Sequence, residues 1–323
     1  YIDNEKIYSK LSKENLPNVT KTTKCVIKDN TPIIKFTPFE DIDFIEHGFS
    51  TRLGGFSSGI YKSMNLTFNM DDKPENVLKN FQKMAQVLDT TVDNMVYSKQ
   101  THTTNVLKVD SSYRGMGIVK ERSFDNIDGL ITNEANVCLV TSYADCVPLF
   151  FVDKVNKCIG SSHSGWRGTV GNIAKNTLEL MNKEFGTRPE DVVTFIGPSI
   201  CEDCYEVSSD VIDEYKKTFS KEELENIVHN GKEEGKYQLN LQMANYYNMV
   251  NSGVIPSNIS ISDICTCCNS DVLFSHRATH GKRGILCASA GCARPCPAGR
   301  LLPESLRHGG YAGRMERRHR HGA

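Results

Sequence analysis

The apolar positions of the chain follow two spacings, which together predict a mixture of helices and strands. After Asp72-Lys73-Pro74-Glu75, where an acidic residue and a proline are typical of a helix start, apolar residues recur every three or four positions up to Leu88. This period predicts an amphipathic helix. Similar helical patterns follow Gly168, Ser208 and Asn240. Short runs of β-branched and aromatic residues predict buried strands at 137–141, 147–152 and 192–196.

No stretch rich in proline and glycine divides residues 30–286, so we expect these residues to form one domain. Residues 1–29 are assigned to an N-terminal extension and residues 287–323 to a separate tail. That tail contains seven Arg, two acidic residues and no Lys, whereas all 24 Lys lie before it. The change in residue usage indicates a different, non-native coding origin. We expect a solvated appendage without a role; the alternative is a basic arm for an anionic partner.

Composition narrows the class of protein. With 323 residues, 39% hydrophobic and 24% charged, the chain is neither disordered nor fibrous. No stretch approaches the roughly 18 uninterrupted apolar residues of a membrane span, and the first 15 residues lack the apolar core of a signal peptide. We therefore expect a soluble, cytoplasmic protein. The net charge of −1 gives no reason to expect nucleic acid or a membrane as partner.

The chain contains twelve cysteines, and reduced thiols are the expectation for a long chain without a secretory signal. Two groups could together provide a four-sulfur zinc site: Cys201 and Cys204, and Cys265, Cys267 and Cys268. Their spacing matches no regular zinc knuckle, so incidental cysteines are the favoured interpretation.

Most of the polar residues that could do chemistry lie between His47 and Arg167. His102, Cys146 and His163 supply one thiolate and two imidazoles, a set that suits zinc with three protein ligands and one position left open. The residues alone also allow a nucleophile and base pair of Cys146 and His163, or no relation among the three. Arg167 follows the sequence His163-Ser164-Gly165-Trp166, where a strand is expected to turn into a helix, and its planar donors suit phosphate.

Several motifs occur in an order that resembles the bacterial laccase-domain proteins, a family first called multicopper polyphenol oxidases and later purine nucleoside phosphorylases. The matching motifs are His47-Gly48-Phe49-Ser50-Thr51-Arg52-x-Gly54-Gly55, Asn65-Leu66, Gln100-x-His102, Asp128-Gly129, Ala144-Asp145-Cys146-x-Pro148, His163-x-Gly165-Trp166-Arg167-Gly168, Gly197-Pro198-x-Ile200 and Phe274-Ser275-His276-Arg277 followed by Gly281-x-Arg283-Gly284. The resemblance covers about residues 30–286. After Ala290 the chain departs from the family pattern, which leaves the last strand and any role for Cys287, Cys292 and Cys296 without support from it.

The resemblance implies an α+β fold, a single domain in which mixed β-sheets are sandwiched between helical layers in the order α/β/β/α. It implies His102, Cys146 and His163 as metal ligands, with zinc as cofactor and copper as the alternative metal. It also implies phosphorolysis of adenosine, inosine and methylthioadenosine, and deamination of adenosine. The partners would then be purine nucleosides and phosphate, and the sequence sets no oligomeric state.

Three further residues receive roles on this basis. Asp145, next to Cys146, is the candidate for proton transfer, although a strand would point it to the opposite face; the alternative is an acceptor that orients an imidazole or Arg167. Arg52, in a glycine-rich turn, and Arg167 are candidate phosphate clamps, against ordinary salt bridging.

Other functions remain open. Copper-dependent oxidation of phenolic substrates is the main alternative. The chain has only six His up to residue 280 and no His-x-His pair among them, whereas copper oxidases use many His ligands. A Cys-His hydrolase and a non-catalytic nucleoside-binding protein are the remaining alternatives.

Overall fold

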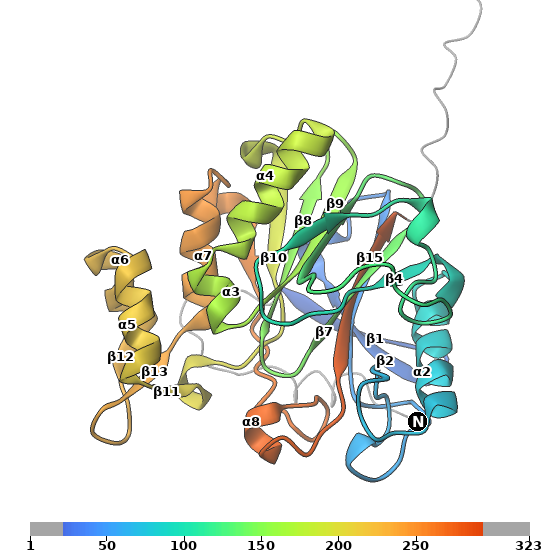
Figure 1. Ribbon diagram of the computed structural model, residues 1–323, viewed down its shortest axis with the longest axis horizontal. Coiled ribbons are helices and arrows are strands. Elements are labelled where there is room, and N and C mark those ends of the chain that lie inside the picture. The colour runs from blue at the N-terminus through green and yellow to red at the C-terminus, as the bar shows by residue number, and fades with distance from the viewer. Residues whose placement is uncertain (1–21, 293–323) are drawn as a thin grey trace, which may run out of the picture.

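The architecture consists of two six-stranded sheets that face each other between layers of helices (Figure 1). The computed structural model describes residues 22–292. No helix within these residues is long and apolar enough to cross a membrane.

The first sheet has the strand order β1-β2-β3-β15-β7-β4. Its neighbours run antiparallel except β4 and β7, which are parallel. The strands are β1 (Thr23–Lys28), β2 (Thr31–Phe36), β3 (Ile45–Ser50), β4 (Met95–Tyr97), β7 (Cys138–Tyr143) and β15 (Leu286–Cys292).

The second sheet has the order β14-β10-β8-β9-β6-β5. Its central pairs are antiparallel, and the outer pairs β10–β14 and β5–β6 are parallel. The strands are β5 (Val106–Lys108), β6 (Gly129–Thr132), β8 (Val147–Asp153), β9 (Cys158–Ser164), β10 (Val192–Ile196) and β14 (Ile259–Ile261).

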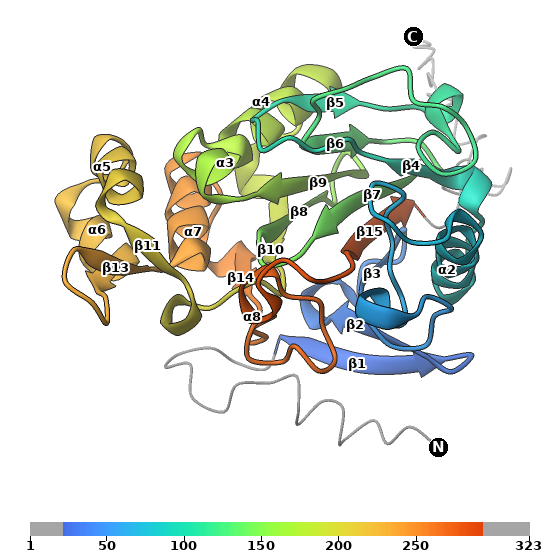
Figure 2. The same ribbon diagram turned by 60° about the horizontal axis from the view of Figure 1, so that its bottom comes forward.

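The space between the sheets is filled by aromatic and aliphatic side chains. Phe36 of the first sheet stacks on Phe195 of the second, with ring centroids 4.2 Å apart, and lies 4.8 Å from Phe150. Helix α2 (Pro74–Val87) covers the outer face of the first sheet, where Phe81 and Met84 are buried with Met95. Helices α4 (Ile173–Phe185) and α7 (Leu241–Asn251) cover the second sheet on the opposite side (Figure 2). The α/β/β/α arrangement expected from the sequence is confirmed.

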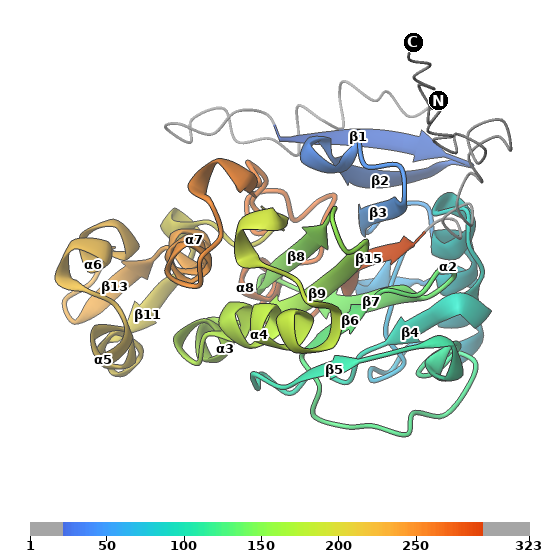
Figure 3. The same ribbon diagram turned by 90° about the horizontal axis from the view of Figure 1, so that it is seen from above.

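A smaller lobe extends from the second sheet (Figure 3). It contains the three-stranded sheet β11-β13-β12 with helices α5 and α6. Its elements are β11 (Glu206–Ser208), α5 (Ser209–Thr218), α6 (Lys221–Ile227), β12 (Val228–Asn230) and β13 (Lys236–Leu239). The remaining helices are α3 (Trp166–Val170), α8 (His276–Thr279) and the 3-10 turns η1 (Thr37–Phe39), η2 (Gly59–Tyr61), η3 (Val92–Asn94), η4 (Ser111–Tyr113), η5 (Pro189–Asp191), η6 (Glu202–Cys204) and η7 (Pro256–Asn258).

The elements predicted from apolar spacing are present. The helix expected after Asp72 is α2, and the strands expected at 137–141, 147–152 and 192–196 are β7, β8 and β10. The patterns after Gly168, Ser208 and Asn240 correspond to α4, α5 and α7.

Regular structure extends past both expected domain limits. Strand β1 lies inside the predicted extension 1–29, and β15 crosses the predicted boundary between residues 286 and 287. β15 pairs with β3 on one side and β7 on the other, so it is a central strand. Cys287 and Ala288 are fully buried there, and small residues suit a strand packed on both faces. The boundary at residue 287 was drawn from a change in residue usage. Strand β15 is rich in Ala, Gly and Cys, so its composition is similar to that of the tail although it belongs to the sheet. Residues 293–323, with Cys296, lie outside the described residues.

Candidate metal centre

Strand register brings the three predicted metal ligands together. Cys146 lies in the turn between β7 and β8, and His163 lies near the end of β9. β8 and β9 are antiparallel, with Val147 opposite Ser164. Cys146, just before β8, and His163, near the end of β9, therefore lie at the same end of this strand pair. His102 enters from the loop that follows β4. The nitrogen and sulfur atoms of the three side chains all lie within 4.8 Å of one another.

The cluster is compact and open on one side. Nε2 of His102 lies 3.9 Å from Sγ of Cys146, and the two imidazole rings meet edge to face with centroids 4.8 Å apart. His163 is buried and Cys146 half-buried, whereas His102 is exposed. Three donors with one exposed side match a catalytic metal site better than a structural one, which is closed by four protein ligands.

Gly165 makes room for the cluster. A Cβ atom at this position would lie 3.1 Å from Sγ of Cys146 and 3.0 Å from Cδ2 of His102. Both distances are tighter than normal van der Waals contact. A side chain here would therefore push the thiol and the imidazole out of place.

Asp128 holds two of the ligands from behind. Its Oδ1 accepts from Nδ1 of His163 at 2.8 Å and from the backbone N–H of His102 at 3.0 Å. Its Oδ2 accepts from the backbone N–H groups of Thr101 and Thr103. This carboxylate fixes the proton of His163 on Nδ1, so Nε2 is left as the donor atom toward a metal.

Two residues at the site have left-handed backbones. His102 has φ of 63° and Asp145 has φ of 91°. Such conformations cost about 1–3 kcal/mol each in residues other than glycine and persist only where surrounding contacts hold them. At His102, the hydrogen bond from its backbone N–H to Asp128 is such a contact.

The electrostatics of the cluster favour a thiolate. Burial would raise the pKa of Cys146, but the charge of His163 and hydrogen bonds from His102 and His163 lower it to about 6. Burial would lower the pKa of His163, but the Cys146 thiolate and the hydrogen bond to Asp128 raise it to about 9. A deprotonated sulfur is the form that ligates metal ions.

A cavity of about 200 Å³ opens at the cluster. His102, Cys146 and His163 contribute to its lining together with polar side chains from the ends of β4 and β7. Gln100 braces the lining, since its Oε1 accepts from Ser98 Oγ and Ser142 N while its Nε2 donates to Ser142 O at 2.8 Å. Among the described residues that line the cavity, none is acidic.

Arg283 also lines this cavity. Its Nη2 donates to Nδ1 of His276 at 3.3 Å, and its Nη1 donates to the carbonyl of Gly284. Its Nε is buried without a hydrogen-bond partner among the described residues. The remaining N–H groups of its Nη1 and Nη2 atoms, at a polar cavity, are suited to an anion.

The structure does not bring Arg52, Arg167 or Asp145 into the lining of the cavity. Arg52 donates to the carbonyls of Lys62 and Ser270, so its guanidinium joins two loops. Arg167 is exposed and lies 4.3 Å over the ring of Trp166.

Asp145 is 7% exposed and does not line the cavity. Its Oδ1 accepts from Thr266 Oγ1 at 2.7 Å and its Oδ2 from Arg277 N at 2.7 Å. Both oxygens therefore hold neighbouring loops, and proton transfer by Asp145 stays a prediction.

Sequence reasoning gave no chemical role to Asp128 or Arg283, although both stand inside recognised motifs. It named the cysteines of a possible four-sulfur site but favoured incidental cysteines; the structure brings Cys201, Cys204, Cys265 and Cys268 together as a second cluster of metal-ligand atoms. Each pair has the spacing Cys-x-x-Cys, which Cys267 obscured in the second pair.

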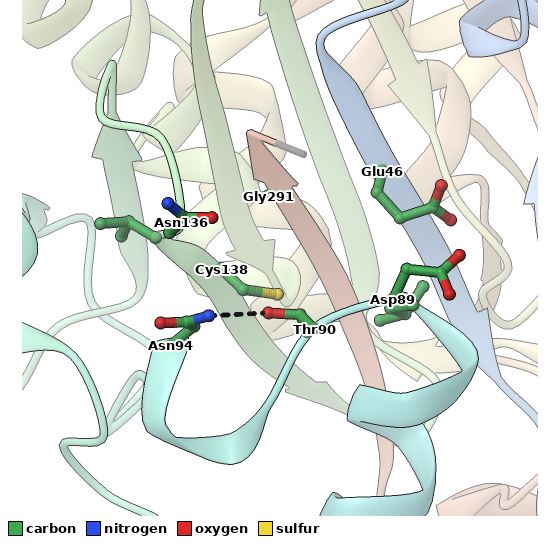
Figure 4. A pocket seen from close by; sticks show the side chains of 9 residues that line it. Glu46, Asp89, Thr90, Asn94, Asn136, Cys138 and Gly291 are labelled. Carbon is green, nitrogen blue, oxygen red and sulfur yellow. Dashed lines mark hydrogen bonds between the residues drawn. The ribbon is translucent and has the colours of Figure 1, made fainter. Parts of the chain in front are cut away.

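Another pocket, of about 50 Å³, lies at the far end of β7 and β15 (Figure 4). It is lined by Cys138 and Gly291 together with Glu46, Asp89 and neighbouring residues. Cys138 begins β7 and Tyr143 ends it beside the metal cluster, which separates the two sites by about 17 Å along the strand. No imidazole or guanidinium lines this second pocket within the described residues.

Comparison with known proteins gives consistent results. A family model described as multi-copper polyphenol oxidoreductase laccase matches residues 46–292. Purine nucleoside phosphorylase YlmD of Bacillus subtilis (strain 168) is 35% identical over 245 residues, 76% of this chain and 87% of the relative. Adenosine deaminase RL5, from an unknown prokaryotic organism, is 33% identical over 74% of this chain and 92% of its own length. The crystal structure of the hypothetical protein YfiH of Bacillus licheniformis superposes with a TM-score of 0.77 at 30% identity, covering 83% of this chain and 98% of that one.

Proposed function

The chain belongs to the multi-copper polyphenol oxidoreductase laccase family, and from this premise we propose that it is a zinc-dependent enzyme of purine nucleosides. The reactions are phosphorolysis of adenosine, inosine and methylthioadenosine, and deamination of adenosine. The observation that carries the proposal is the open three-ligand cluster at the base of a polar cavity that also exposes an arginine. The names of the relatives, purine nucleoside phosphorylase and adenosine deaminase, support it.

The residues fit a zinc ion. Two imidazoles and a thiolate are preferred zinc ligands, their donor atoms lie within 4.8 Å of one another, and a Cβ at Gly165 would fill the space beside them. His102, Cys146 and His163 would hold the ion. When bound, it supplies Lewis acidity, which makes water a nucleophile near neutral pH.

The side chains of the cavity account for both reactions. Phosphorolysis forms a bond from a phosphate oxygen to C1′ of the ribose and breaks the bond from C1′ to the purine nitrogen, and the purine leaves with a proton. Arg283 supplies donors for the phosphate anion. Deamination adds water at C6 of adenosine and releases ammonia. Asp128 keeps His163 oriented throughout, and Gln100 fixes the loop that carries His102.

A product assay with matched variants tests the proposal. Purified protein should convert inosine and phosphate to hypoxanthine and ribose 1-phosphate, and adenosine to inosine and ammonia. Cys146→Ala should abolish both, because water cannot replace a thiolate ligand at similar affinity. Cys25→Ala, which changes a half-buried cysteine of β1 outside the cavity, should retain both. Equal activity in the two variants would refute the assignment.

Oxidation of phenols with copper is the second candidate, because imidazole and thiolate donors also suit copper. The same preparations, loaded with copper and supplied with a phenol and oxygen, distinguish the two. Phenol oxidation without nucleoside turnover would favour this candidate over the first.

A further inference from the structure

Four cysteines form a second cluster, none of which lines the cavity. Cys201 precedes the turn η6 after β10 and Cys204 is the last residue of that turn, whereas Cys265 and Cys268 lie in the loop between β14 and α8. The four sulfur atoms all lie within 4.8 Å of one another, although 60 residues separate the pairs.

The sulfur atoms lie close enough together to ligate one ion. With zinc–sulfur bonds of about 2.3 Å, neighbouring sulfurs in a tetrahedral site lie about 3.8 Å apart. Sγ of Cys268 lies 4.0 Å from Sγ of Cys201 and 3.4 Å from Sγ of Cys204. A [2Fe–2S] or [4Fe–4S] cluster distributes its four cysteine sulfurs over two or four irons, so sulfurs on different irons lie farther apart than the 4.8 Å limit found here.

Backbone donors point at the sulfur of Cys265. The N–H of Cys201 donates to it at 3.2 Å and the N–H of Cys268 at 3.4 Å. Hydrogen bonds of this kind orient thiolate ligands and offset their negative charge. One of these N–H groups belongs to each cysteine loop, so both loops orient the sulfur of Cys265.

We propose that Cys201, Cys204, Cys265 and Cys268 bind a structural zinc ion, separate from the three-ligand site. Four protein sulfurs close the coordination shell and leave no position for water or substrate, which is the arrangement of a structural site. The two Cys-x-x-Cys pairs supply two ligands each, as in zinc sites of other folds.

The position of this site links it to the turn that carries Cys146. Thr266, between the ligands Cys265 and Cys268, donates to the Asp145 carboxylate, and Arg277 donates its Nη1 to the carbonyl of Cys204. Asp145 in turn adjoins Cys146 of the cavity. A zinc ion that joins the two loops therefore positions Asp145, and through it the turn that carries Cys146.

Metal stoichiometry tests the proposal independently of any reaction catalysed. The full chain, purified without added metal, should contain two zinc ions. Cys146→Ala should retain one, and Cys204→Ser/Cys268→Ser should also retain one. The triple variant Cys146→Ala/Cys204→Ser/Cys268→Ser should contain no zinc. Cys267→Ser, in the same loop but outside the four-sulfur cluster, should retain two.

Cobalt substitution identifies the ligands. Cobalt in the Cys146→Ala variant should show the intense thiolate charge-transfer absorption of a four-sulfur tetrahedral site, and this absorption should be lost in the triple variant. Chelation of the Cys146→Ala protein, in which the four-sulfur cluster holds the remaining zinc, should lower its Tm by at least about 5 °C, and zinc should restore it. This measurement leaves all four cysteines in place, so it remains decisive where a variant of the cluster fails to fold.

Three results would overturn the proposal. The first is a single zinc in the wild-type protein that disappears completely with Cys146→Ala. The second is a disulfide between Cys204 and Cys268, detected by mass spectrometry in metal-free protein of unchanged Tm. The third is iron in place of zinc. Loss of nucleoside activity with two zinc ions still bound would refute the proposed function but not this site.

Discussion

Replacing Asp128 by Asn tests whether the carboxylate behind the metal ligands does more than stabilise the fold. Asp128 is fully buried, and its two oxygens accept from both ligand-bearing segments. An amide can present an oxygen on one side only. With the oxygen toward His163, the N–H groups of Thr101 and Thr103 face an NH₂ group and lose their acceptor. With the NH₂ group toward His163, the imidazole must move its proton to Nε2, the atom needed for the metal.

Each orientation leaves one or two partly buried donors without their acceptor, and about 1–3 kcal/mol is the upper range for each, so the free energy of unfolding should fall by at most about 2–6 kcal/mol. Metal affinity and kcat/KM should fall about 10- to 100-fold, because the altered residue no longer orients the imidazole. Chelator competition measures the affinity, and inosine phosphorolysis measures kcat/KM.

Asp153→Asn is the matched control. Asp153 is also fully buried, and it accepts from the backbone of Val155 and Asn156 in the hairpin between β8 and β9, outside the cavity. This variant should lose stability without losing metal affinity. If Asp128→Asn binds metal as tightly as the unaltered chain, or if both variants lose affinity equally, the orienting role assigned to Asp128 is refuted.

Two further predictions follow from buried polar groups. Arg283→Lys should reduce inosine phosphorolysis about 10-fold at fixed phosphate while adenosine deamination changes little, because lysine keeps the charge but loses the planar donors; equal loss in both reactions, measured with phosphate varied, would remove Arg283 from phosphate binding. Burial lowers the pKa of His47 to about 3, and its Nε2 accepts from Phe36 N–H, so the folded protein keeps this imidazole neutral. Stability from this group is therefore present above pH 6.5 and lost as pH falls toward 3, by about 2 kcal/mol at pH 5. Urea unfolding at pH 7 and pH 5 should show this loss in the unaltered chain but not in His47→Gln, which keeps an acceptor; an identical pH dependence would contradict it.

The sequence was most informative where one local pattern decides the structure. Helix α2 follows from the spacing of Val77, Phe81 and Met84, whose side chains are all buried on one face. The ligands His102, Cys146 and His163 required a family resemblance, because spacings of 44 and 17 residues carry no geometric information. Only the pairing of β8 with β9 shows why the last two meet.

Features that depend on tertiary structure could not be decided from the sequence. The possible four-sulfur site was disfavoured because its cysteines lie in two loops 60 residues apart, and their proximity comes from the parallel pairing of β10 with β14. Asp145 was assigned by its nearness in sequence to Cys146; in the structure it has a left-handed backbone and its carboxylate accepts from Thr266. The order of strands in a sheet, the sign of the backbone angle φ and the contacts between loops are properties of the folded chain. No local pattern of residues predicts them.

The position of β15 determines when the chain can fold. Leu286–Cys292 is the last described strand, yet it lies between β3 and β7, and its partner Ile45–Ser50 precedes it by about 240 residues. Contacts of such sequence separation slow folding, because a long loop must close before they form. During synthesis β3 and β7 therefore remain unpaired along their facing edges until residue 292 has been made. Any product that ends before β15 would present those two edges to other chains and so be prone to aggregation.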